Sequence, residues 1–474
     1  MPEVSEVLAA ARRAYLIAPA GCGKTEVIAD AVAQSSGRQL ILTHTHAGVE
    51  TLRSRLRKKG VPSNRFHVDT IASWSLRYAH SYPHLSGLAE DPTLIAGKDW
   101  NRVYECADVL LSSRVAREVV QRSYSGLFVD EYQDCGVRHH AIVMRLAELL
   151  PCRLLGDPLQ GIFDFGGDLI DWEKDVDRNF ERLPDLLTPW RWSAAGGGSE
   201  ALGSWLLEVR EMLMNGRDVD LSVAPGCVDW KQHDPSNNAD MLKHCGKKAE
   251  LRGSVIIVHR FPNLCHRLAK DLSGQYQSMD EMEAKDLMRH ASLIDEARGT
   301  EAALLIDFAA ECMVGIATAL KPLADRYRSG NLATSGQRAA YLGLVSALDL
   351  VARSPAPQAM LAVLTAIRRE CADCKMCRQE LWTEMRRALA NMAETSMLLR
   401  ECAWTVRNNT RVSGRQSHRL MVSRTLLVKG LEFDHAIILE ANLLSPKNLY
   451  VALTRAKQTL TVWSPSPVLR PYFR

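Results

Sequence analysis

The stretch Leu16–Ala29, "LIAPAGCGKTEVIA", joins an apolar run to a helical pattern through a short segment of small residues. The apolar run that begins at Ala14 has the length of a buried strand, and "TEVIADAVAQ" carries apolar residues at the spacing of an amphipathic helix. Glycine accepts backbone angles that other residues avoid, so the segment between them can turn tightly. Strand, glycine-rich turn and helix in this order predict the start of a parallel α/β sheet.

The same alternation continues on both sides of this stretch. Apolar runs recur in "QLILTHT", "GLFVDE", "CRLLGD" and "GSVIIVHR", each followed by a helical pattern, and strands return near the end of the chain in "HAIILEAN" and "QTLTVWS". Two intervening regions are mostly helical in pattern. We therefore expect a first α/β domain (1–75 and 124–195) with a helical insertion (76–123), and a second α/β domain (196–276 and 416–474) with a helical insertion (277–415).

Composition supports a folded protein of more than one domain. The chain has 474 residues, of which 46% are hydrophobic and 24% charged, which is near the globular average. Its formal net charge of +4 permits a nucleic-acid partner without indicating one. Because we find neither a signal-peptide pattern nor an apolar stretch near the ~20 residues of a membrane span, we expect a cytoplasmic protein without a membrane partner.

The glycine-rich turn fits a phosphate-binding loop, with alanine at its first position. Backbone N–H groups in such a loop and at the following helix N-terminus face an anion. Lys24 would reach the β- and γ-phosphates of a nucleotide, and Thr25 would ligate Mg²⁺. The residues expected to bind the nucleotide here are Ala18, Pro19, Ala20, Gly21, Cys22, Gly23, Lys24 and Thr25.

Two acids follow a second apolar run, in "GLFVDEYQD". Unpaired charge at the end of a buried strand is costly, so Asp130 and Glu131 need a role. Beside a phosphate-binding loop, one acid can hold Mg²⁺ and the other can deprotonate the attacking water. We assign the metal to Asp130 and the water to Glu131.

These and further segments resemble the motifs of superfamily 1 helicases of the UvrD/Rep/PcrA type. The matching segments are "THTHAGVETLRSRL" (Thr43–Leu56), "DTIASWSLRYA" (Asp69–Ala79), "VDEYQD" (Val129–Asp134), "GDPLQGIFDFGG" (Gly156–Gly167), "LTPWRW" (Leu187–Trp192), "KGLEFDHAIIL" (Lys429–Leu439) and "LYVALTRAKQTL" (Leu449–Leu460). The resemblance implies an α/β fold of two RecA-like parallel-sheet domains with reduced, mainly helical insertions. It also implies hydrolysis of ATP with Mg²⁺.

The resemblance also assigns roles to single residues. It implies that Gln133 and Gln160 contact the nucleotide or the attacking water, that Glu432 meets the ribose, and that two arginines act as arginine fingers on the transferring phosphate, namely Arg191 and Arg455. It implies contact with single-stranded or tailed DNA for Thr43, His44, Thr70, Ser73, Phe163 and Phe165, with bases stacking on the two phenylalanines. Two phenylalanines at this spacing are otherwise most simply core residues.

The chain departs from the family pattern mainly where DNA is bound. Ala47 replaces a lysine, Ile71 and Ala72 replace a Phe-His pair, and Gly166 replaces an arginine. The segment Arg424-Thr425-Leu426 stands where the family has Thr-x-His. No glutamine precedes Gln34, so the residue that reads adenine in the family is missing.

Three cysteines in "ECADCKMC", Cys371, Cys374 and Cys377, allow a metal or iron–sulfur site with Cys402 as a fourth ligand. The flanks read as one continuous helix, on which this spacing would spread the thiols over about 120°. Reduced, unligated thiols are therefore the expected state.

Three functions remain open at this point. The first is an ATP-dependent 3′–5′ single-stranded DNA translocase or helicase within an anti-phage defence complex, because the short chain resembles the helicase subunit of Gabija systems, whose partner is an OLD-family nuclease. The second is a nucleotide- and DNA-binding regulatory subunit that controls such a nuclease. The third is a DNA repair helicase.

Overall fold

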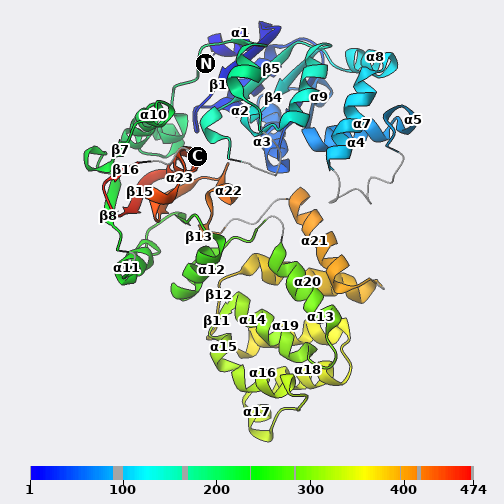
Figure 1. The fold of residues 1–474 in the computed structure, drawn as a ribbon, viewed down its shortest axis with the longest axis vertical. Coiled ribbons are helices and arrows are strands. Elements are labelled where there is room, and N and C mark those ends of the chain that lie inside the picture. The colour runs from blue at the N-terminus through cyan, green and yellow to red at the C-terminus, as the bar shows by residue number, and fades with distance from the viewer. Residues whose placement is uncertain are drawn as a thin grey trace. The chain divides into compact units, whose positions relative to one another are not determined.

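The computed structural model describes residues 2–88, 100–162, 169–234, 236–281, 284–395, 397–413 and 418–470. The chain divides into two compact units (Figure 1). The first comprises Met1–Val228, Leu444–Gln458 and Arg470–Arg474, and the second comprises Asp229–Leu443 and Thr459–Leu469. Among the described helices, none is both long enough and apolar enough to cross a membrane.

The first unit is built on a six-stranded sheet in the order β3-β2-β4-β5-β1-β6. All neighbouring strands in it run parallel. Its strands are β1 (Arg13–Ile17), β2 (Gln39–Thr43), β3 (Phe66–Thr70), β4 (Gly126–Val129), β5 (Cys152–Gly156) and β6 (Glu181–Arg182). Strand β5 lies between β1, which leads into the glycine-rich turn, and β4, which ends at the two acids.

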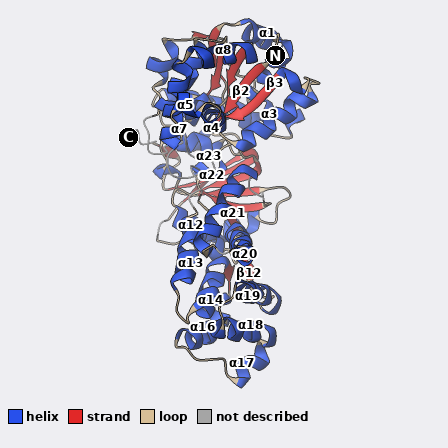
Figure 2. Cartoon of the chain, turned by 90° about the vertical axis from the view of Figure 1, so that its right-hand side faces the viewer, coloured by secondary structure: helices blue, strands red, loops and turns tan. Residues whose placement is uncertain are grey.

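Helices cover both faces of this sheet (Figure 2). They are α1 (Pro2–Ala10), α2 (Lys24–Gln34), α3 (His46–Lys58), α4 (Ile71–His80), α7 (Trp100–Ser112), α8 (Arg114–Ser123) and α9 (Val137–Ala147). The first unit also contains α5 (Pro83–Ser86), α10 (Glu200–Met214) and α23 (Pro446–Leu453). Side chains alternate along each strand, so Leu16 and Ile41 pack with α1, α2 and α3 while Tyr15 and Leu40 pack with α4, α7 and α9.

The second sheet has the order β10-β13-β9-β14-β15-β8. Its strands are β8 (Val228–Gln232), β9 (Val255–Val258), β10 (Gln277–Ser278), β13 (Leu420–Ser423), β14 (Phe433–Ile438) and β15 (Ala456–Ser464). The central strands β9, β13 and β14 are parallel, and the short helices beside them are α11 (Ala239–Lys248), α12 (Pro262–Asp271) and α22 (Thr425–Val428). With two such sheets, the predicted α/β fold class of two RecA-like domains is confirmed.

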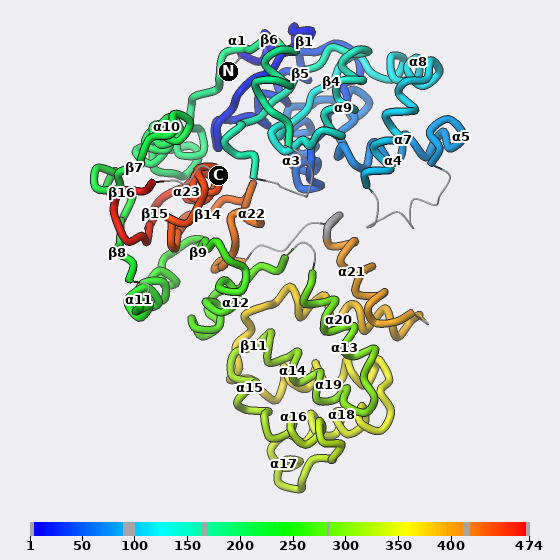
Figure 3. Tube along the Cα trace, in the orientation of Figure 1, coloured from blue at the N-terminus to red at the C-terminus, as the bar shows by residue number. Residues whose placement is uncertain are grey.

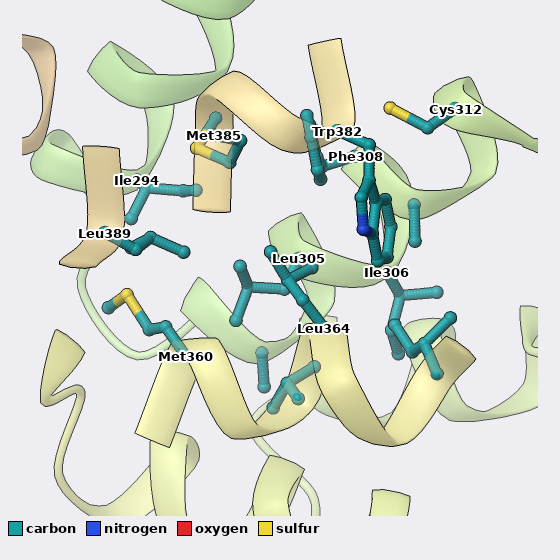
Figure 4. Packing of buried hydrophobic residues seen from close by; sticks show 14 of the residues in the cluster. Ile294, Leu305, Ile306, Phe308, Cys312, Met360, Leu364, Trp382, Met385 and Leu389 are labelled. Atoms are coloured by element: carbon teal, nitrogen blue, oxygen red, sulfur yellow. The ribbon is translucent and has the colours of Figure 1, made fainter. Parts of the chain in front are cut away.

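A group of packed helices lies between β10 and β13 in the chain (Figure 3). Its helices are α13 (Lys285–Glu296), α14 (Glu301–Cys312), α15 (Ile316–Ala319), α16 (Lys321–Arg328), α17 (Ser335–Ala340), α18 (Leu342–Arg353), α19 (Pro357–Glu370), α20 (Gln379–Glu394) and α21 (Leu399–Ser413). Its core is apolar, with Phe308 stacked on Trp382 at 5.8 Å beside Leu305 and Leu364 (Figure 4). The exact domain boundaries given above stay a prediction.

The cysteine-rich segment differs from its expected form. Instead of one continuous helix, α19 ends at Glu370, a turn follows, and β12 (Lys375–Met376) pairs antiparallel with β11 (Met313–Val314) before α20 begins. No disulfide joins any of the cysteines, all of which lie in the described part of the chain. Among the described residues the one close group of metal-type ligands is His266, Asp280 and Asp286, and Arg378 forms ion pairs with both of these aspartates. The four cysteines do not form such a group.

Candidate nucleotide site

The glycine-rich turn after β1 has the shape that an anion site needs. Gly21 and Gly23 adopt left-handed backbone angles, with φ of 71° and 86°. Helix α2 begins directly at Lys24, and Glu26 N and Val27 N donate to Gly23 O at 3.0 Å. The free N–H groups of a helix N-terminus favour an anion at this position.

Lys24 is the cation of this site. Its Nζ lies 2.8 Å from Glu131 Oε1 and 3.9 Å from Asp130 Oδ1, and the residue is buried. Burial lowers the pKa of Lys24, but the two neighbouring acids raise it more, so its pKa lies above the usual value. Lys24 is therefore charged at neutral pH.

The two acids sit at the carboxyl end of β4, as expected from "GLFVDE". Asp130 is buried, and its Oδ1 accepts a hydrogen bond from Glu131 N at 2.9 Å. Glu131 has a left-handed backbone, with φ of 56° and ψ of 42°. Such a conformation costs a side-chain-bearing residue about 1–3 kcal/mol and is found mainly at functional sites. It turns the Glu131 carboxylate toward Lys24.

The amide of Gln133 links these acids to strand β5. Its Nε2 donates to Glu131 Oε2, and its Oε1 accepts from Asp157 N at 2.9 Å. Glycine is needed at position 156, since a Cβ there would lie 2.6 Å from Gln133 Oε1. Gln160 Nε2 donates to Asp157 Oδ2 at 2.9 Å, so both glutamines that were assigned to the nucleotide meet at one aspartate.

Both assigned arginines lie in the first unit with the glycine-rich turn. Arg191 N donates to Gly21 O at 3.1 Å, and its guanidinium donates to Thr454 O at 2.9 Å. Arg455 is buried and donates to Val451 O and to the hydroxyl of Thr454. These bonds place the two arginines on one connected set of residues.

Helix α23 reaches the loop itself. Ala20 N donates to the hydroxyl of Tyr450 at 3.3 Å, and Trp192 Nε1 donates to Ala456 O at 2.7 Å. A Cβ on Gly21 would lie 2.6 Å from the Trp192 ring, so the loop is packed tightly against Trp192. The sequence motifs contained Tyr450 and Asp157 but gave no sign of these contacts.

The other assigned residues are less clearly grouped. Thr43 and Thr70 are buried, and the Thr70 hydroxyl caps α4 by accepting from Ser73 N at 2.9 Å. His44 Nε2 lies 3.4 Å from Cys135 Sγ. Glu432 is exposed and belongs to the second unit. Phe163 and Phe165 lie outside the described residues.

Besides Asp157 and Tyr450, sequence reasoning missed a residue of this site that lies outside every motif. Arg210, on α10, donates to Asp157 Oδ1 at 2.9 Å. In the sequence it is one of three charged residues in the amphipathic stretch "SWLLEVREMLM", which gives it no distinguishing signal.

Comparisons with known proteins show likeness of structure alone. Neither a protein-family model nor a curated protein matches the sequence. Two solved structures of the Arterivirus helicase nonstructural protein 10, one with DNA and one described without it, align at TM-scores of 0.36 and 0.37 with 12% and 11% identity. The helicase of PRRSV aligns at 0.34 with 12% identity. Each alignment covers 98% of this chain but only 63%, 62% and 54% of the respective helicase, so the chain spans less than two thirds of those proteins.

Proposed function

We propose that the chain is an ATP-dependent 3′–5′ single-stranded DNA translocase or helicase of the UvrD type. The observation that carries the hydrolysis is the connected set of side chains from Lys24 through Glu131, Gln133 and Asp157 to Gln160, next to a loop that suits phosphate. The 3′–5′ direction of translocation and the DNA substrate are proposed from the motif resemblance.

Five residues of the site have a proposed step in the reaction. Lys24 and the N-terminus of α2 bind the β- and γ-phosphates. Glu131 takes a proton from the attacking water, and Gln160 orients that water. Arg191 and Arg455 stabilise the charge that develops on the equatorial oxygens.

The donor set also fits magnesium. Thr25 offers a hydroxyl in the first turn of α2, and Asp130 offers a buried carboxylate at the end of β4. Oxygen donors of this kind are those that Mg²⁺ prefers. When bound, the ion would neutralise phosphate charge, and Thr25 and Asp130 would hold it.

The assigned base can be tested with Glu131→Gln. We expect this variant to bind ATP with unchanged affinity, because the amide keeps the side chain's shape, and to lose at least ~10²-fold in turnover, because it cannot accept the proton. Steady-state hydrolysis with and without single-stranded DNA measures the loss. The matched control is Glu118→Gln, since Glu118 pairs with Arg114 on the surface. Turnover above a tenth of wild type would mean that Glu131 is not the base.

A second function has an observation in its favour. Thr43 and Thr70, two of the assigned DNA contacts, are buried. This supports a regulatory subunit whose nucleotide state controls a partner without unwinding DNA. Strand displacement on a 3′-tailed duplex separates the two functions, because unwinding by this chain alone contradicts a purely regulatory role.

We propose further that the partner is an OLD-family nuclease in an anti-phage defence complex. The support is the resemblance of the short chain to the helicase subunit of such systems. Identification of the neighbouring genes and co-expression with an OLD-family nuclease found there, followed by size-exclusion chromatography, test the pairing. Separate elution of the two proteins, with and without ATP and DNA, would contradict it.

A further inference from the structure

The ion pair between Arg210 and Asp157 lies next to the assigned catalytic residues. The Arg210 side chain is 12% exposed, and that of Asp157 is fully buried. Burial lowers the pKa of Arg210, and Asp157 raises it more, so the net pKa is raised. Desolvating two charges costs free energy that their attraction only partly returns, so a buried pair is weak support for a purely stabilising role.

Asp157 is the point at which the two assigned glutamines meet. One carboxylate oxygen, Oδ2, accepts from Gln160 Nε2, while the other, Oδ1, accepts from Arg210 and from Leu159 N at 3.3 Å. The main-chain N–H of Asp157 donates to Gln133 Oε1. A single residue therefore contacts both amides through different groups.

These contacts fix which way each amide faces. The carboxylate of Asp157 only accepts hydrogen bonds when ionised, so it holds the NH₂ end of Gln160 and turns the carbonyl end away. The main-chain N–H of Asp157 only donates, so it holds the carbonyl end of Gln133 and turns that NH₂ end toward Glu131. The orientation of both amides depends on the position of Asp157. The orientation of Gln160 also depends on the negative charge of the Asp157 carboxylate.

We propose that Arg210 is a positioning residue for nucleotide hydrolysis, which holds the ionised Asp157 so that Gln160 presents its carbonyl oxygen to the attacking water. Arg210 touches neither the nucleotide nor the water and acts only through Asp157. This inference rests on the proposed function.

The test is a pair of substitutions at Arg210 in the full chain. Arg210→Met keeps the apolar stem and removes the charge, so we expect kcat to fall ~10–100-fold, as for a displaced catalytic group, with KM for ATP changed less than ~3-fold. Arg210→Lys restores a cation at the same place and should recover much of kcat. Arg114→Met is the control, because the Arg114 side chain is 92% exposed.

A transition-state analogue distinguishes positioning from phosphate binding. Arg210→Met should weaken binding of ADP with aluminium fluoride by about the same factor as kcat, because the analogue occupies the place of the reacting phosphate and needs the oriented glutamine. Binding of ADP alone should be unchanged. An equal loss for both ligands would overturn the assignment.

A double variant separates positioning from charge balance. Asp157→Asn combined with Arg210→Met removes both charges of the pair and leaves neither partner unpaired, so its thermal midpoint should rise above that of Arg210→Met. If Arg210 only balanced charge, kcat would recover as well, and that recovery would overturn the inference. We expect kcat to stay low.

The outcomes also separate this inference from the proposed function. If the wild type hydrolyses ATP and Arg210→Met has the same kcat, the inference about Arg210 is overturned but the proposed function is not. Failure of wild type to bind ATP or the aluminium fluoride analogue, with Mg²⁺ and single-stranded DNA present, overturns the proposed function and the inference with it. If wild type binds but does not hydrolyse ATP on its own, the affinity for the analogue decides the role of Arg210.

Discussion

The carboxyl ends of β1 in the first sheet and of β9 in the second carry very different loops. After β1 the chain turns through Gly21 and Gly23, and α2 begins at Lys24. After β9 it passes through His259, and α12 has Pro262 in its first turn, which has no N–H to offer. Phe261 N donates to His259 Nδ1 at 3.0 Å, so that N–H is also used locally.

Each sheet also has a glutamate with a positive φ near its carboxyl edge. Glu131 follows β4 with φ of 56°, and Glu440 follows β14 with φ of 48°. Glu131 pairs with Lys24, whereas Glu440 lies 2.9 Å from His259 Nε2 and 3.6 Å from His233 Nε2. Burial lowers the pKa of His259, against the opposing effect of Glu440. A glutamate with a positive φ therefore pairs with a lysine in the first unit and with two histidines in the second. The two sheets are alike, and it is the residues in the loops after their strands that differ.

The largest expected effect comes from removing the cation of the first unit. Lys24→Ala should lower ATP turnover by ~10²–10³-fold, because a preorganised charge that stabilises the transition state is lost. Lys243→Ala, on the exposed side of α11 in the second unit, should leave turnover unchanged. Steady-state hydrolysis at saturating ATP measures both. Equal losses of turnover in the two variants would contradict the assignment of ATP hydrolysis to the site of the first unit.

A smaller effect is expected at the glycines. Gly21→Ala should cost ~1 kcal/mol for its positive φ, a further penalty for the contact with Trp192, and part of the turnover, because Arg191 is displaced. Gly330→Ala, in the second unit, has φ of 73° and open space around the new methyl group, so only the first cost applies. Thermal unfolding of both variants gives the difference. A similar loss of stability in the two variants would show that Trp192 can move to make room for the methyl group at position 21 at little cost.

The smallest expected effect is a loss of folding stability at acidic pH. Two histidines of the first unit and one of the second should contribute to it. Burial lowers the pKa of His67, His139 and His266 to about 4. The unfolded chain, with histidine pKa near ~6.5, then binds more protons than the native state between about pH 6.5 and 4. Stability should fall as pH is lowered through this window and be fully present above it.

Urea unfolding at pH 7.0 and pH 5.0 measures this loss. His139→Phe removes one of these groups from the first unit, so its stability should change less between the two pH values than that of wild type. His266→Phe makes the same test in the second unit. A pH dependence unchanged in both variants would show that other groups control the acid response.

Local patterns predicted most of the strands and helices, and nonlocal contacts account for what was missed. Apolar runs such as Leu40–Leu42 and Leu127–Val129 became buried strands, because their side chains are covered on both faces of the sheet. The segment around Cys374 read as helix from its flanks. In the structure β12 pairs there with β11, and a partner some 60 residues away leaves no trace in a local pattern.

The candidate site shows the same division. Lys24, Asp130 and Glu131 could be found because each stands next to a strand in a recognisable motif. The contact between Arg210 and Asp157 spans 53 residues, and the one between Ala20 and Tyr450 spans 430. Neither the spacing nor the residue types of such pairs predict contact, so they appear only once the fold is known.

The position of α23 has a consequence for biosynthesis. Residues 444–458 belong to the first unit, where Tyr450, Thr454 and Ala456 bond to Ala20, Arg191 and Trp192. A ribosome therefore makes the glycine-rich loop early but supplies its last supports only after some 450 residues. Domains usually fold as units in the order of synthesis, and long-range contacts form slowly. The nascent first unit therefore cannot complete the contacts around its nucleotide site until most of the second unit has been translated.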